Sequence, residues 1–146
     1  MLVTGTEILQ DAHKNNYAVG AFNVNNMEIV QAIIEAAEET NSPVILQASQ
    51  GGLKYAGVEY IAALGRLAAE KAKVPVALHL DHGTDFDQVM LCIRHGFSSV
   101  MIDGSRFDLE GNIAITKKVI EVAHAVGVSV EAELGKIGGT EDDIVV

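Results

Sequence analysis

The residues with the clearest chemical potential lie in the segment 79–83, which is His-Leu-Asp-His-Gly. The segment ends an apolar run, so Asp81 and His82 stand at the end of a predicted strand, and Gly83 allows a sharp turn. A carboxylate beside an imidazole at such a position suits a metal ligand next to a general acid or base. We favour this functional interpretation for His82, whereas His79, deeper in the strand, fits a hydrogen-bonded structural residue.

Further carboxylates follow two later apolar runs. Glu131 and Glu133 are two residues apart, so they share one face of a strand, and Asp103 ends the run before them. Buried like charges are costly unless a cation or hydrogen-bond donors balance them, and the sequence offers no evident buried Arg or Lys nearby. A metal ion is therefore a reasonable counter-charge. The alternative is a solvated edge strand with exposed acids.

Together, Asp81, His82, Asp103 and Glu133 supply oxygen and nitrogen ligands of the kind that Zn²⁺ accepts. A catalytic zinc ion usually takes three protein ligands, so one histidine is too few. We expect the missing ligands to come from strands that this sequence does not contain.

Two loops add weaker signals. Adjacent glycines and acids at residues 136–143 are typical of a mobile active-site loop in which Glu141 could act as a base, although an acidic tail would have the same composition. Residues 49–52, Ser-Gln-Gly-Gly, could bind a phosphate through the Ser49 hydroxyl and backbone N–H groups. Cys92 lies among apolar residues and is predicted to pack in the core.

Five apolar, β-branched runs are the predicted strands that position these residues. They begin roughly 25 to 31 residues apart, the size of one βα unit, and cover residues 18–24, 43–49, 74–81, 98–104 and 128–135. Stripes of helical period separate them. The capping signals are Thr4 with Glu7, Asn25 with Glu28, and Thr84, and the stop signals are Gly96 and Gly127.

Strict alternation of strands and helices predicts a parallel sheet covered by helices, either an open doubly wound sheet or a (β/α)8 barrel. No Gly-x-Gly-x-x-Gly follows the first strand, which argues against a dinucleotide fold. Each strand has one apolar face and one face that becomes polar toward its carboxyl end. This pattern favours the (β/α)8 TIM barrel, whose chemistry gathers at the carboxyl ends of its strands.

A complete barrel needs eight βα units, or about 250 residues, whereas this sequence has 146 residues and ends just after the fifth strand. We therefore interpret residues 1–146 as the N-terminal portion of a single TIM-barrel domain whose remaining strands are absent from this sequence.

Composition excludes several classes of protein. Ten basic and 20 acidic side chains give a net charge of −10, which argues against binding to nucleic acid or to anionic lipid. A single Cys excludes a disulfide framework. The sequence has neither a signal peptide nor an apolar run long enough to span a bilayer, so we expect a soluble cytoplasmic protein.

In these motifs the sequence resembles a known family, the class II, metal-dependent fructose-bisphosphate aldolases, and the closely similar tagatose-bisphosphate aldolases. Residues 74–83 resemble one family signature, and residues 130–135 with Gly138, Gly139 and Glu141 resemble the other. Residues 20–26 and 98–103 are also similar to family segments.

The resemblance implies a (β/α)8 lyase of glycolysis and gluconeogenesis that forms homodimers or homotetramers. It would reversibly cleave fructose 1,6-bisphosphate into dihydroxyacetone phosphate and glyceraldehyde 3-phosphate, with Zn²⁺ polarising the substrate carbonyl and with a second or alternative position for a divalent ion. The implied roles are metal ligation for His82, Asp103 and Glu133, proton transfer for Asp81 and Glu141, and substrate binding for Ser49 and Asn23.

The family's two other zinc histidines and its Gly-rich phosphate loop have no counterpart here, so the chain is not expected to be active alone. Three alternatives stay open. The substrate could be tagatose bisphosphate, the barrel could be a metal-dependent hydrolase, or the chain could be an inactive half-barrel that serves as a binding or assembly module.

Overall fold

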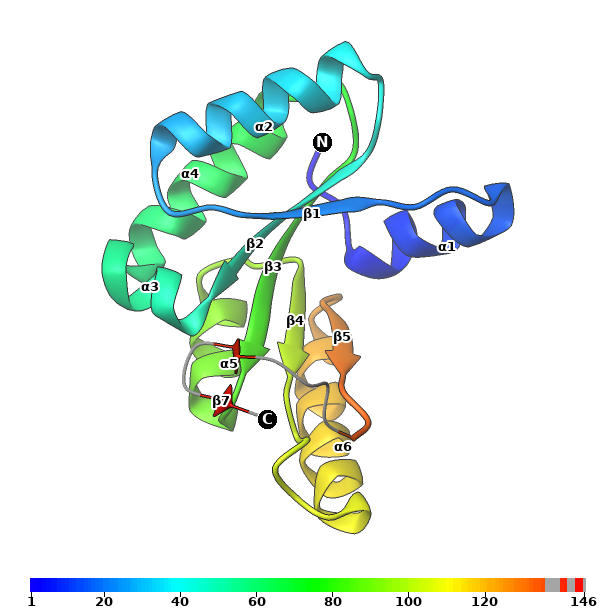
Figure 1. Cartoon of the computed structure of the whole chain (residues 1–146), viewed down its shortest axis with the longest axis vertical. Helices are drawn as coiled ribbons and strands as arrows, with labels where there is room; N and C mark the ends of the chain where they lie inside the picture. Colours follow the sequence, from blue (N-terminus) through cyan, green and yellow to red (C-terminus); the bar gives the residue numbers. More distant parts are fainter. Residues whose placement is uncertain (136–139, 142–143, 146) are drawn as a thin grey trace.

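The computed structural model describes residues 1–135 and, for the backbone alone, residues 140–141 and 144–145. Its helices and strands alternate along the chain (Figure 1). The helices are α1 (Gly5–Asn15), α2 (Met27–Glu39), α3 (Gln50–Ala56), α4 (Val58–Lys71), α5 (Phe86–Arg94) and α6 (Leu109–Ala125). The strands are β1 (Gly20–Asn23), β2 (Val44–Ser49), β3 (Val76–Gly83), β4 (Ser99–Ile102), β5 (Ser129–Ala132), β6 (Thr140–Glu141) and β7 (Ile144–Val145).

The main sheet has the order β1-β2-β3-β4-β5, and every neighbouring pair is parallel. A doubly wound sheet reverses its strand order at a switch point, whereas a barrel keeps its strands in chain order. The consecutive order therefore confirms the predicted fold class, with this chain supplying the first five strands of a (β/α)8 barrel. The short strands β6 and β7 pair with each other in antiparallel fashion.

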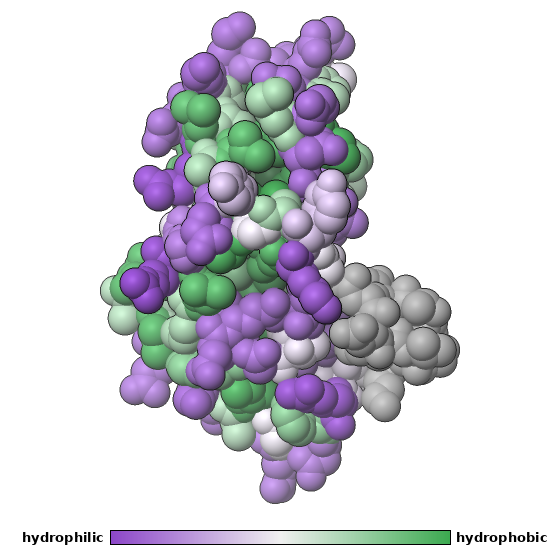
Figure 2. All heavy atoms as spheres, turned by 90° about the vertical axis from the view of Figure 1, so that its left-hand side faces the viewer, coloured by the Kyte–Doolittle hydropathy of each residue, from purple (hydrophilic) through white to green (hydrophobic). Residues whose placement is uncertain are grey.

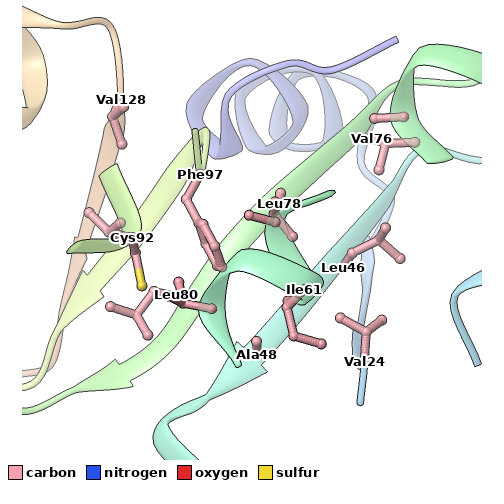
Figure 3. Close-up of a cluster of buried hydrophobic side chains, with 14 of the residues drawn as sticks. Val24, Leu46, Ala48, Ile61, Val76, Leu78, Leu80, Cys92, Phe97 and Val128 are labelled. Atoms are coloured by element: carbon pink, nitrogen blue, oxygen red, sulfur yellow. The ribbon is translucent and has the colours of Figure 1, made fainter. Parts of the chain in front are cut away.

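The hydrophobic core lies between the outer face of this sheet and the helices. Val76, Leu78 and Leu80 alternate along β3 and are fully buried in one apolar cluster. Figure 3 shows strand residues of this cluster together with Ile61 of α4 and Phe97. Cys92 of α5 is buried in the same cluster, which confirms its predicted packing role. Burial of these side chains fixes which strand face points toward the helices and leaves the polar face pointing inward.

Helix α1 covers the inner face at the amino ends of the strands. The Gly5 backbone N–H donates to Ser129 Oγ at 3.0 Å. A Cβ atom at this position would lie 2.7 Å from Ser99 Oγ, so only glycine permits this close approach. The predicted capping box of Thr4 and Glu7 begins the helix. Because α1 closes this end, the inner face of the described strands is accessible from their carboxyl ends.

Two predicted helix caps are wrong by one residue. The N-cap of α2 is Asn26, not Asn25, and the N-cap of α5 is Asp85, not Thr84. In each case two adjacent residues are competent caps, and the second one accepts the hydrogen bond from the helix: Asn26 from the Ile29 N–H and Asp85 from the Gln88 N–H. The predicted C′ glycines, Gly96 and Gly127, are confirmed by their left-handed φ angles of 89° and 74°.

Residues 50–56 form helix α3, whereas the sequence predicts a loop at residues 49–52. Ser49 caps this helix, because its hydroxyl oxygen accepts a hydrogen bond from the Gly52 N–H at 3.3 Å. The two glycines disfavour a helix locally, but Leu53 is buried in the core and holds the turn in place.

The outward surfaces of the helices mix apolar and polar side chains. Figure 2 shows hydrophobic residues interspersed with hydrophilic ones on the side of the molecule that lies to the left in Figure 1. In the described part of the chain, no helix combines the length and apolar character that a membrane span requires.

Candidate metal centre and active site

Three predicted site residues come together beyond the carboxyl ends of β3, β4 and β5. His82 Nδ1 lies 2.9 Å from Asp103 Oδ2 and 3.7 Å from Glu133 Oε2. One ligand atom from each residue lies within 4.8 Å of the others. One imidazole and two carboxylates, converging from three strands, form a donor set that suits a divalent cation such as Zn²⁺.

The backbone of His82 is shaped to bring its side chain into this cluster. Its φ angle is 47°, in the left-handed region that a residue with a Cβ rarely adopts. The pairing of β3 with β4 shifts register between Leu80 and Gly83, so β3 bulges at this point. The Gln50 side-chain amide donates to the His82 carbonyl oxygen at 2.8 Å and supports the bulge. Strain of this kind concentrates at functional sites.

Gly83 is required directly after the bulge. A Cβ atom at this position would lie 2.7 Å from both the Met101 carbonyl oxygen and Leu80 Cδ2. Its close approach to β4 sets the distance between the ends of the two strands that carry His82 and Asp103.

Asp103 is only 3% exposed, yet it is held as a carboxylate. Burial opposes its ionisation, but hydrogen bonds from His82 and Ser105 outweigh that effect, and the pKa of Asp103 is lowered. Its Oδ1 accepts from the Ser105 N–H at 2.9 Å, while Oδ2 faces His82. A carboxylate can only accept, so the Nδ1 atom of His82 carries the proton. A metal ion held among the three residues would take the place of this proton at Nδ1, whereas a metal ion at Nε2 would leave Asp103 as the carboxylate that orients the ring.

His79 has the structural role that we favoured for it. The side chain is buried, and its Nδ1 lies 2.8 Å from Ser99 Oγ on the neighbouring strand. Burial, together with the charge of His82, lowers the pKa of His79 to about 4. The ring is therefore neutral near pH 7, so its 3.4 Å approach to Glu131 Oε2 is a polar contact and not an ion pair.

Glu131 shares the inner face with Glu133 but stands apart from the cluster of three. Partial burial raises the pKa of Glu131, and the negative charges of Asp81 and Glu133 raise it further, while His82 opposes them. The carboxylates at this end of the sheet thus repel one another. A bound cation would reduce this repulsion.

The other predicted site residues lie at the carboxyl ends of β1, β2 and β3. Asp81 Oδ2 accepts a hydrogen bond from Gln47 Nε2 at 3.0 Å, and the same amide nitrogen is 3.5 Å from Asn23 Oδ1. Ser49 is the register partner of Asp81 on β2. The backbone of Glu141 forms part of β6, but its side chain, like all of residues 136–139, lies outside what the structure describes.

The sequence predicts no side-chain role for Gln47, Gln50 or Ser105. Each of them supports a candidate site residue: Gln47 contacts Asp81, Gln50 holds the His82 backbone, and Ser105 donates to Asp103. The alternation of β2 already placed Gln47 on the inner face. The sequence pattern does not predict that the Gln50 side chain supports His82, because residues 49–52 are predicted to form a loop that binds through the Ser49 hydroxyl and backbone N–H groups.

Comparison with known proteins shows where this chain belongs. The family model described as fructose-bisphosphate aldolase class-II matches residues 3–146. A fructose-bisphosphate aldolase of Thermus caldophilus is 56% identical over 149 residues, covering 100% of this chain and 48% of that protein. A fructose-bisphosphate aldolase of Helicobacter pylori strain J99 is 50% identical over 145 residues, covering 99% of this chain and 47% of that protein.

Solved structures agree with the sequence comparison. The crystal structure of the YdjI aldolase from Escherichia coli K12 superposes with a TM-score of 0.89 at 39% identity, covering 92% of this chain and 53% of that one. The chain thus spans about half the length of the relatives that it matches. Strand order, residue motifs and these similarities agree, and the chain belongs to the class II fructose-bisphosphate aldolase family.

Proposed function

We propose that this chain forms part of a metal-dependent aldolase that reversibly cleaves fructose 1,6-bisphosphate into dihydroxyacetone phosphate and glyceraldehyde 3-phosphate. The observation that carries the proposal is the convergence of His82, Asp103 and Glu133 at the carboxyl ends of their strands, in a chain of this family. Asp81 precedes His82 in the sequence and lies at the same carboxyl end of β3.

We further propose that residues 1–146 are the N-terminal portion of one TIM-barrel domain. The relatives are about twice as long, and both edges of the sheet carry apolar surface. At the β1 edge, Phe22 is 51% exposed and lines a groove with Ala36 and Val44. Beyond β5, Leu134 is 81% exposed. Further strands and helices of the same domain would cover these surfaces.

In this proposal His82, Asp103 and Glu133 hold Zn²⁺ or a similar divalent ion. The mixed nitrogen and oxygen donors and the buried carboxylate of Asp103 fit such an ion. When bound, the ion supplies a Lewis acid for the carbonyl oxygen of the substrate.

The residues of the chain handle the protons. In the cleavage direction Asp81 takes the proton from the C4 hydroxyl as the C3–C4 bond breaks, and the bonding electron pair stays with the dihydroxyacetone phosphate half. Glu141 then delivers a proton to C3. In condensation both transfers reverse. Asn23 and Ser49 bind the substrate from the ends of β1 and β2, where Ser49 is the register partner of Asp81 and Asn23 is the register partner of Gln47.

Tagatose bisphosphate, which differs at C4, is the alternative substrate. A homodimer or homotetramer stays a prediction that follows from the family resemblance, and a cytoplasmic location stays a prediction from the sequence. The open sheet edges also suit the alternative of an inactive binding or assembly module, which would need neither metal nor Asp81.

The decisive experiment replaces Asp81 with Ala in the complete polypeptide. Triose phosphate formation should fall by about 10²-fold or more, because a positioned proton-transfer group contributes about this much, while zinc content should be unchanged. Asp87→Ala, at an exposed position on α5, is the matched control. Turnover in the Asp81 variant equal to that of the parent would exclude the proposed mechanism. A complete polypeptide without zinc or turnover would support the binding module.

A further inference from the structure

Helix α6, which lies against β5, carries a buried asparagine near its amino end (Figure 1). Asn112 is only 7% exposed and belongs to the buried residues of this helix, together with Val119 and Ala123. A buried amide costs free energy unless its donors and acceptor are paired, so an apolar residue would suit this face better. The presence of asparagine therefore needs a reason outside the helix.

The Asn112 side chain reaches the end of β5. Its Nδ2 donates to the backbone carbonyl oxygen of Glu133 at 2.7 Å. A carbonyl oxygen can only accept, so the NH2 group of the amide must face Glu133 and the Oδ1 atom must face away. The Thr116 hydroxyl, one turn later on α6, donates to that Oδ1 at 3.3 Å. Both halves of the amide are thus engaged, and its orientation is fixed.

This hydrogen bond acts where the pairing of the sheet has ended. The register of β4 with β5 runs as far as Ile102 and Ala132, so Glu133 lies one residue beyond it. The chain then turns, because Gly135 has a φ angle of 79°. The side chain of Glu133 is nevertheless largely buried, with Oε2 3.7 Å from His82 Nδ1. A donor from α6 holds the backbone of this acid at the point where it leaves the sheet.

The same side chain packs against the residue that follows Asp103. A Cβ atom at Gly104 would lie 2.7 Å from Asn112 Cγ and 3.2 Å from Asn112 Cα, so only glycine permits this approach. Asn112 therefore contacts the backbone next to Asp103 and the backbone of Glu133. These are the two acids of the cluster that His82 faces.

We propose that Asn112 is a positioning residue for the metal centre. By holding the ends of β4 and β5 at a fixed separation, it directs the carboxylates of Asp103 and Glu133 toward His82. Asn112 itself touches neither the metal ion nor the substrate, and it acts through the backbone of Glu133. This inference rests on the proposed function, because it requires that the cluster binds a divalent ion.

The test is Asn112→Leu in the complete polypeptide, because leucine has the same branching at Cγ but cannot donate. We expect the zinc dissociation constant to rise about 10-fold, the lower end of the effect of residues that support metal ligands. The matched control is Asn15→Leu, at an exposed position near the end of α1. The control should bind zinc as the parent does.

Two further measurements distinguish positioning from packing. Zinc should raise the Tm of the Asn112 variant less than that of the parent, because the stabilisation by a ligand depends on its dissociation constant. A residue that only packs would lower the Tm of the metal-free and zinc-loaded forms equally. The visible absorption spectrum of the Co²⁺-loaded protein, which reports the arrangement of the ligands, should also differ between variant and parent.

The outcomes separate this inference from the proposed function. A parent polypeptide that binds no zinc contradicts the metal centre, and with it the proposed function. If the parent binds zinc and the Asn112 variant has the parental dissociation constant, or loses the same Tm with and without zinc, the positioning role is wrong. Should the Leu variant not fold, Asn112→Ala is subject to the same criteria, because alanine favours the helix and also removes the donor.

Discussion

Replacing Asp103 with Asn tests how the candidate metal centre is organised. Both oxygens of Asp103 accept hydrogen bonds at 2.9 Å, Oδ2 from the His82 ring and Oδ1 from the Ser105 N–H. Asparagine has one acceptor oxygen and an NH2 group that cannot accept. Whichever way the amide turns, one of the two hydrogen bonds is lost.

The size of the effect follows from these contacts. A hydrogen bond to a charged group contributes about 1.5–3 kcal/mol, and loss of a carboxylate that orients a metal-binding histidine typically weakens metal affinity about 10- to 100-fold. We therefore expect the zinc dissociation constant of the complete polypeptide to rise by at least about 10-fold, the lower end of that range. Loss of a direct ligand would increase it further.

The assay is competition for zinc against a chelator of known affinity. Asp108→Asn is the control, because Asp108 caps α6 from an exposed position and asparagine caps equally well. The control should bind zinc as the parent does. If the Asp103 variant also binds zinc with the parental affinity, the cluster is not a metal centre, and the argument from its geometry fails.

Two further predictions concern stability and the geometry of the strand ends. The pKa of His79 is lowered from 6.5 to about 4 by burial and by the charge of His82, so its contribution to stability is present above pH 6.5 and is lost as pH falls toward 4. The shift corresponds to at most about 3 kcal/mol. Denaturant unfolding at several pH values should show this loss in the parent relative to His79→Gln; parallel curves would refute it. Gly83→Ala should weaken zinc binding and lower stability by roughly 1–3 kcal/mol, because the added Cβ would lie 2.7 Å from the Met101 carbonyl oxygen. Unchanged zinc affinity and thermal unfolding in that variant would contradict the tight packing of β3 against β4.

The fold class, and the end of the sheet at which the reactive residues gather, can be predicted from the sequence. Alternating apolar and polar residues set which face of each strand is buried, and that periodicity is a local property. In parallel strands of matched direction, polar residues at the carboxyl ends must then meet at one edge. For this reason Asp81, Asp103 and Glu133 could be predicted to lie near one another before any contact was known.

The individual contacts between side chains depend on how the folded chain brings distant residues together. The pairing of His82 with Asp103 joins residues 21 apart in the chain, and that of Gln47 with Asp81 joins residues 34 apart. The left-handed backbone of His82 depends on a bulge against β4, and helix α3 depends on core packing at Leu53. Local preference does not encode such features, because they are stabilised by neighbours that only the folded chain brings together.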